Sequence, residues 1–209
     1  MKTAVIIPAY NEARTIGEII GVVKQVPFVN ETIVVSDGSD DDTAGVAESA
    51  GAKVINLTEN QGKGGAMMVG VNNTDADVVL FLDADLIGLQ PQHVVDLLLP
   101  VIEGRAEMTV GIFGQGRLAT DLAQIIAPYL SGQRAVKKDL MIQLSSLELT
   151  RFGVEVALTR FAKTAGISVV EVELRDMSHI MKEEKLGFVR GFLARLKMYW
   201  EIAKCVGKG

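Results

Sequence analysis

A chain of 209 residues, of which 48% are hydrophobic and 22% charged, is typical of one folded domain and unlike a disordered protein. The net charge of −5 argues against a general nucleic-acid binder. Cys205 is the single cysteine, which excludes an intrachain disulfide and fits a reducing compartment. No segment has the ~18 apolar residues of a membrane-spanning helix. We therefore expect a cytoplasmic protein.

The first 113 residues alternate apolar strands with helices. Strands are predicted at residues 3–8, 32–36, 53–57, 77–82 and 108–113. Helices are predicted after Asn11, which can cap the first one, and at residues 43–50, 61–72 and 91–102, with Gly51 in the left-handed position that ends the second. This alternation predicts an α/β domain with a mostly parallel central sheet and helices on both faces.

The second half of the chain is less regular. Residues 114–131 are predicted to be partly helical, 131–134 to form a loop, 154–165 a helix and 168–174 a strand. Residues 182–209 hold seven Lys or Arg against three Asp or Glu, which leaves a net charge of −9 for residues 1–181. Apolar residues recur at helical spacing in this segment, so we predict a basic, amphipathic helical tail at the C-terminus.

Two carboxylates end the most apolar strand. Asp83 and Asp85 follow the run at residues 78–82, with Ala84 between them. Such groups are costly to bury in a sheet, so we expect them where the strand reaches the surface, at its carboxyl end. Mg²⁺ binds one or two carboxylates together with substrate phosphates, which makes a metal site one interpretation. The other is a solvated turn.

Polar residues beside other strands also admit two interpretations. Asp37 lies at a strand end, where its carboxylate can accept an N–H group of a nucleobase. The acidic residues that follow it need only stabilise a helix start. Lys63 lies among three glycines, at residues 62, 64 and 65, that either cradle phosphate or form a flexible helix entrance. Their spacing is not that of a P-loop.

Three further features are ambiguous. Residues 114–119 match a loose dinucleotide-binding pattern, but they come late in the chain and no acidic strand end follows at the usual distance. His179 follows a predicted strand and is either a surface residue or a metal ligand, for which imidazole suits Mn²⁺ better than Mg²⁺. Glu155 begins a predicted helix, where the helix dipole alone would explain an acidic residue.

Four blocks of sequence, in order, resemble the family 2-type glycosyltransferases of the GT-A fold. They are residues 5–12 (VIIPAYNE), 34–43 (VVSDGSDDDT), 60–64 (NQGKG) and 82–85 (LDAD). SGQR at 131–134, FGVE at 152–155 and His179 are similar to the acceptor side of glucosyl-3-phosphoglycerate synthases and their relatives, which are longer. The resemblance implies one nucleotide-diphospho-sugar transferase domain, with a donor half at 1–113, an acceptor half at 114–180 and the tail at 181–209.

The resemblance also implies roles for single residues. Mg²⁺ or Mn²⁺ is expected on Asp85 and His179, and a UDP-sugar beside it as the donor. Asp83 would position the donor, and Glu155 would lie near the sugar or the acceptor as a candidate base, so that these two and Asp85 form the catalytic set. The donor pocket is expected to comprise Pro8, Ala9, Tyr10, Glu12, Asp37, Gly38, Lys63, Asp83 and Ala84, and the acceptor side Gly132, Gln133 and Arg134.

These implications describe a metal-dependent transferase that moves a sugar from UDP-glucose, or another nucleotide sugar, to a small phosphorylated or carboxylated acceptor or to a lipid phosphate. The metal would stabilise the charge on the departing nucleoside diphosphate. The alternative is a nucleotide-sugar-binding regulatory protein without turnover. The tail suits a homodimer interface, which we favour, or peripheral contact with the anionic inner face of a membrane.

Overall fold

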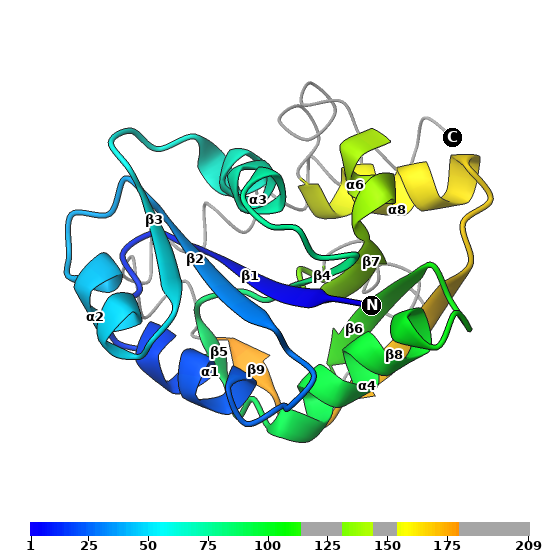
Figure 1. The fold of residues 1–209 in the computed structure, drawn as a ribbon, viewed down its shortest axis with the longest axis horizontal. Helices are drawn as coiled ribbons and strands as arrows, with labels where there is room; N and C mark the ends of the chain where they lie inside the picture. Colours follow the sequence, from blue (N-terminus) through cyan, green and yellow to red (C-terminus); the bar gives the residue numbers. More distant parts are fainter. Residues whose placement is uncertain (114–130, 144–153, 180–209) are drawn as a thin grey trace, which may run out of the picture.

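The structure, a computed structural model, describes residues 1–113, 131–143 and 154–179. Its centre is a seven-stranded sheet in the order β3-β2-β1-β4-β7-β6-β8 (Figure 1). The strands are β1 Thr3–Ala9, β2 Glu31–Asp37, β3 Lys53–Leu57, β4 Val78–Phe81, β6 Met108–Phe113, β7 Arg134–Lys137 and β8 Val169–Leu174. Neighbouring strands are parallel except at β7, which is antiparallel to both β4 and β6.

The three central parallel strands set the position of the polar loops. β1 pairs with β2 from Ala4↔Glu31 to Ala9↔Ser36, and with β4 from Thr3↔Val78 to Ile6↔Phe81. Most residues of these strands are buried because helices cover both faces, which explains why they read as continuous apolar runs. Parallel pairing brings the carboxyl ends of β1, β2 and β4 to one edge of the sheet.

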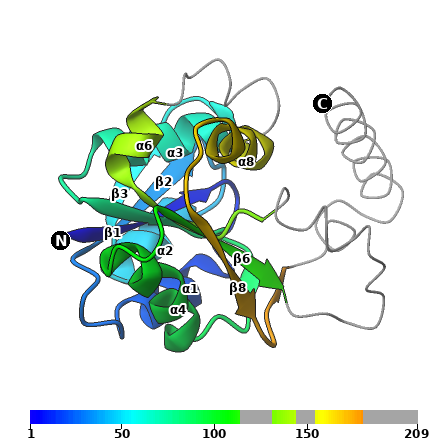
Figure 2. The same ribbon diagram turned by 90° about the vertical axis from the view of Figure 1, so that its right-hand side faces the viewer.

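Helices lie on both faces of the sheet, as Figures 1 and 2 show. One face carries α1 Ile16–Val23, α2 Thr43–Ser49 and α4 Pro91–Ile102, and the other carries α3 Gly62–Asn72, α6 Lys138–Gln143 and α8 Val154–Thr164. Each face has its own hydrophobic core. Ile20 and Leu97 belong to the first core, and Met67 and Leu158 to the second. The predicted α/β fold with a mostly parallel sheet is confirmed.

Local predictions at helix ends have mixed outcomes. Gly51 adopts the predicted positive φ, at 84°, and α4 has the predicted bounds, with Pro91 in its first turn. The predicted cap at Asn11 is wrong, because α1 begins at Ile16 after Thr15. Asn11 instead has a φ of 57°, and its Oδ1 accepts the N–H of Asp40 at 2.8 Å. Its side chain therefore ties the loop after β1 to the loop after β2.

Two features are absent from the sequence predictions. Arg134, expected in a loop, begins the antiparallel strand β7. The short strands β5 Leu86–Ile87 and β9 Ser178–His179 pair with each other outside the main sheet. The predictions for residues 114–130 and for the basic tail lie outside the described residues. Among the helices that are described, none is long and apolar enough to cross a membrane.

Candidate active site

Three loops meet at the sheet edge formed by the carboxyl ends of β1, β2 and β4. The backbone N–H of Asn11 donates to Oγ of Ser39 at 3.1 Å, which joins the first two loops. The Thr15 hydroxyl donates to the carbonyl of Ala84 at 2.6 Å, which joins the first loop to the third. The residues that end these three strands therefore lie together.

Asp37 ends β2 and holds the loop that leads into α3. It is 3% exposed, and its Oδ1 accepts the backbone N–H of Gln61 at 2.7 Å. The side-chain amide of Asn60 donates to the Asp37 carbonyl at 3.0 Å. Gly38 follows with a φ of +70°, and a Cβ there would lie 2.8 Å from the backbone nitrogen of Asn60, so this turn requires glycine. The Asp37–Gly38 pair thus fixes where α3 begins.

Lys63, in the first turn of α3, lies between two carboxylates. Its Nζ is 2.5 Å from Oδ1 of Asp83, which follows β4, and 2.5 Å from Oε1 of Glu155, in the first turn of α8. Burial alone would lower the pKa of Lys63, but the charges of Asp83 and Glu155 outweigh it and raise the pKa. The ammonium is therefore protonated at neutral pH and holds the two acids together.

Residues 131–133 lie against this ion pair. The Gln133 amide donates through Nε2 to Oδ2 of Asp83 at 2.9 Å. A Cβ on Gly132 would lie 2.5 Å from Nζ of Lys63 and 2.6 Å from Oδ1 of Asp83, so a side chain here would displace the pair. Both oxygens of Asp83 are thus engaged by protein donors. These contacts hold the Asp83 side chain in one orientation.

Asp85 lies in the turn that follows β4 and is half-buried. The next residue, Leu86, pairs with His179 across β5 and β9, so the backbone brings His179 beside this turn. Among the described side chains, which do not include that of His179, no group of three or more His, Cys, Asp or Glu could hold a metal. One carboxylate and one imidazole, completed by ligand phosphate oxygens, suit Mn²⁺ or Mg²⁺. The residues therefore fit a metal that protein and ligand hold jointly.

Arg134, expected on the acceptor side, is 1% exposed. Its Nε donates to the Ser131 carbonyl at 2.9 Å, and its Nη2 donates to the Thr159 hydroxyl at 2.8 Å. Burial lowers the pKa of Arg134 to about 10 and Glu155 partly offsets this, so the guanidinium is charged at neutral pH. Thr159 is absent from the sequence predictions. Its position one helical turn after Glu155 is the signal that could have identified it.

Comparison with known proteins places this arrangement in a family. Residues 4–152 match the family described as Glycosyl transferase family 2, a span that includes the three strand-end loops, Lys63 and residues 131–134. The chain belongs to glycosyl transferase family 2. This assignment argues against the dinucleotide-binding interpretation of residues 114–119.

Two of the proteins to which the chain is similar are glucosyl-3-phosphoglycerate synthases. The chain is 34% identical over 108 residues to that of Mycolicibacterium smegmatis, an alignment that covers 47% of this chain and 36% of the relative. It is 29% identical over 216 residues to that of Mycobacterium tuberculosis, covering 84% of this chain and 66% of the relative. The chain thus matches no more than two thirds of the length of these two relatives.

Solved structures of the Mycobacterium tuberculosis synthase share the fold. The complex with Mn²⁺, UDP and glucosyl-3-phosphoglycerate matches with a TM-score of 0.71 at 28% identity, covering 86% of this chain and 72% of that one. The complex with Mg²⁺ and UDP also has a TM-score of 0.71, at 26% identity, and covers 93% and 79%. The expected GT-A transferase fold of family 2 is confirmed.

The remaining residues predicted for the donor pocket of this family 2 chain lie at the same sheet edge. Pro8 is half-buried and Ala9 buried at the end of β1, whereas Tyr10 is 48% exposed. Because Ala9 pairs with Ser36, Tyr10 comes beside Asp37 at the edge. Ala84 is buried and Glu12 half-buried. An exposed aromatic ring next to a buried carboxylate suits a flat polar ligand such as a nucleobase.

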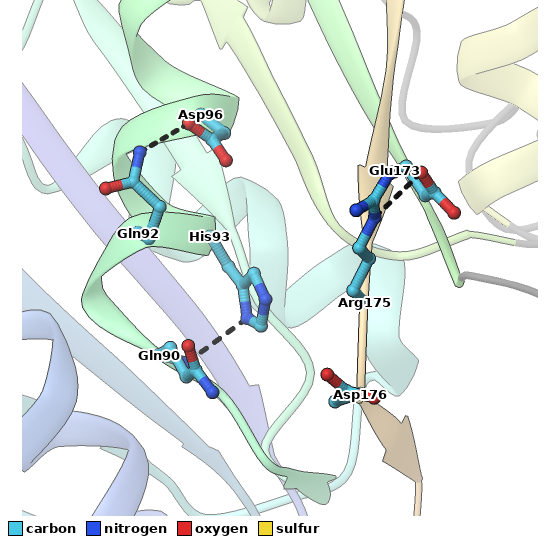
Figure 3. Close-up of a pocket in the computed structure, with 7 residues that line it drawn as sticks. All are labelled: Gln90, Gln92, His93, Asp96, Glu173, Arg175 and Asp176. Carbon is cyan, nitrogen blue, oxygen red and sulfur yellow. Dashed lines mark hydrogen bonds and ion pairs between the residues drawn. The ribbon is translucent and has the colours of Figure 1, made fainter.

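A hollow of about 490 Å³ lies away from these residues, between the start of α4 and the end of β8 (Figure 3). Its polar side chains, apart from that of Asp176, contact one another or nearby backbone. Gln92 donates to Asp96 at 2.7 Å and Arg175 donates to Glu173 at 3.0 Å. His93 accepts a backbone N–H at 3.2 Å through Nδ1, which closes the start of the helix. These contacts explain most of the polar lining without a ligand, and the sheet edge stays the candidate active site.

Proposed function

We propose that this chain transfers a sugar from a UDP-sugar, with UDP-glucose as the first candidate, to an acceptor that carries a carboxylate or a phosphate. The observation that carries the proposal is the single sheet edge at which Asp37, the Lys63–Asp83 pair and Asp85 meet. A solved relative holds UDP-glucose, phosphoglyceric acid and Mn²⁺ together, which supports the same combination of ligands here.

Asp37 and Tyr10 are the residues proposed to bind the nucleoside. Gln61 engages Oδ1 of Asp37, and in the described part of the chain no hydrogen bond reaches Oδ2. This oxygen can accept the N–H of a uracil ring, and the exposed ring of Tyr10 offers a face for stacking. Pro8 and Ala9 would shape the floor of the same pocket.

Lys63 and a divalent ion, held by Asp85 and His179, are proposed to compensate the negative charge of the diphosphate. A divalent ion, when bound, stabilises the negative charge that accumulates on the departing UDP. Asp85 and His179 are the ligands proposed for it. Lys63 adds a positive charge on a helix N-terminus, where the helix dipole also favours phosphate. Asp83, held by Lys63 and Gln133, keeps this ammonium in place.

Glu155 is the carboxylate proposed to face the acceptor. Its ion pair with Lys63 fixes its orientation at the start of α8, where it is 21% exposed. A carboxylate so placed can accept the proton of an attacking hydroxyl group, or can hydrogen-bond to the sugar. Gly132 lies against the same ion pair, and its lack of a side chain is what lets Lys63 and Asp83 approach this segment.

Product analysis tests this proposal. We expect the protein, given UDP-glucose, Mn²⁺ and 3-phosphoglyceric acid, to release UDP and to form a glucosylated acid that mass spectrometry detects. A parallel reaction with a polyprenyl phosphate tests the lipid acceptor. Asp85→Asn should lower the rate by ~100-fold or more because it removes a metal ligand. Asp75→Asn makes the same change of charge on an exposed residue before β4, at the opposite end of that strand from Asp85, and should keep the wild-type rate.

Two other outcomes would be informative. UDP binding without transfer to either acceptor or to water would favour the regulatory alternative. Absence of both UDP binding and UDP release would contradict the proposal.

A further inference from the structure

Arg134 is a buried cation to which the proposed reaction gives no part. It is 1% exposed and lies in mid-sheet, where β7 pairs with β4 at Phe81 and with β6 at Val110. A guanidinium in such a place loses its hydration, and a hydrophobic side chain of similar volume is often as stable or more so. The contacts of Arg134 therefore indicate what this charge is for.

One side of the guanidinium fixes the segment that lies on Asp83. Nε of Arg134 donates to the Ser131 carbonyl at 2.9 Å. The Ser131 hydroxyl donates to Oε1 of Gln133 at 3.1 Å, and this contact orients the amide. The Nε2 of the same amide then donates to Oδ2 of Asp83 at 2.9 Å. A continuous path of hydrogen bonds thus runs from Arg134 to Asp83.

The other side of the guanidinium fixes the helix that carries Glu155. Nη2 of Arg134 donates to the Thr159 hydroxyl at 2.8 Å, and this hydroxyl donates to the Glu155 carbonyl at 2.9 Å. The same helical turn presents Oε1 of Glu155 to Lys63 at 2.5 Å. Arg134 is therefore linked by two separate paths to the two acids that hold Lys63.

We propose that Arg134 is a positioning residue that sets the spacing of Asp83 and Glu155 across Lys63 from inside the sheet. Its kinetic consequence rests on the proposed transferase function, whereas its structural consequence does not. A guanidinium suits this task because its donors point in fixed directions, so one side chain can hold two partners. A lysine ammonium keeps the charge but lacks this forked arrangement of N–H donors.

Hydrogen exchange on the full chain tests the two paths without reference to activity. Arg134→Met and Arg134→Lys should speed amide exchange at residues 131–137 and 154–164 together, because both remove the fork. Arg134→Lys keeps the charge and serves if Arg134→Met does not fold. Thr159→Val cuts only the second path and should speed exchange at 154–164 alone. Ile20→Ala opens a cavity in the core of the opposite face and controls for general loss of stability.

Kinetics test the consequence for the site. With UDP-glucose and 3-phosphoglyceric acid, Arg134→Lys should lower kcat by ~10- to 100-fold, a larger factor than its effect on KM for UDP-glucose, because small misplacements of reacting groups mainly cost turnover. Ile20→Ala should keep the wild-type kcat. If the wild type transfers no glucose, the proposed function fails while the exchange experiment still decides the inference.

Two results would overturn the inference. One is exchange at residues 131–137 and 154–164 that is no faster in the Arg134 variants than in Ile20→Ala. The other is a wild-type kcat in Arg134→Lys.

Discussion

At the scale of single residues, the site depends on the contacts of Lys63 and on the absence of a side chain at position 132. Lys63 contacts Asp83 and Glu155, each at 2.5 Å, and a Cβ on Gly132 would enter this contact. The requirement for glycine is one of space, because the backbone of Gly132 does not have the positive φ found at Gly38. Glycine at position 132 therefore lets the Lys63–Asp83 pair pack directly against the backbone of this segment.

Gly132→Ala should therefore displace Lys63 from Asp83. We expect the variant to lose about 1–3 kcal/mol of unfolding free energy through overpacking, and to bind UDP with Mn²⁺ more weakly. Gly21→Ala is the matched control, because this exposed position in α1 has nothing within 4 Å of the added Cβ. It should gain about 0.5–1 kcal/mol from helix propensity. Urea unfolding measures the free energy for both variants. An unfolding free energy of Gly132→Ala equal to that of the wild type would contradict the packing of Lys63 and Asp83 against Gly132.

At the scale of elements, hydrogen bonds fix the loop after β1 against the loop after β2. Asp41 accepts the backbone N–H groups of Ala13 at 3.1 Å and of Thr43 at 3.0 Å, so it joins the entrance of α1 to that of α2. Burial by itself would raise the pKa of Asp41, but hydrogen bonds from Thr43 and Ala13 outweigh it and lower the pKa. This carboxylate therefore supports the edge of the nucleoside pocket from outside.

The lowered pKa of Asp41 predicts a pH dependence of stability. Its contribution is fully present above the ordinary carboxyl value and is lost as the pH falls through the lowered value in the folded state. Asp41→Asn should therefore cost about 0.5–1 kcal/mol at neutral pH, a small figure because the group is exposed. The cost should shrink below about pH 4. Urea unfolding at neutral and acid pH measures it, and an equal cost at both would refute this role.

The elements that could be predicted are those whose apolar residues recur at the spacing of a helix or a strand. The bounds of α4 and β6 agree with the prediction because apolar periodicity marks both. β7 could not be predicted, since its four residues begin with Arg134 and end with Lys137. Pairing with β4 and β6 makes this segment a strand, and that pairing is a property of the tertiary structure rather than of local sequence.

At the scale of the whole molecule, the convergence of the strand ends could be predicted because parallel strands share one edge. The partners within the site could not be predicted. Lys63 meets Glu155, which is 92 positions away in sequence, and Gln133 meets Asp83 across 50 positions. The burial of Arg134 could not be predicted either. It was expected in a loop on the acceptor side, whereas it lies buried in the sheet. The expected homodimer and membrane contact concern the tail and stay predictions.

The central claim is that UDP and a divalent ion bind together at the edge formed by β1, β2 and β4. A thermal-shift titration tests it most directly, because a ligand at 100 times its Kd stabilises the folded state by about 2.7 kcal/mol. We predict that UDP and Mn²⁺ together raise Tm by more than the sum of their separate effects, that Asp85→Asn removes this excess, and that Asp75→Asn keeps it. An unchanged Tm with UDP and Mn²⁺, or an excess that survives Asp85→Asn, would contradict the claim.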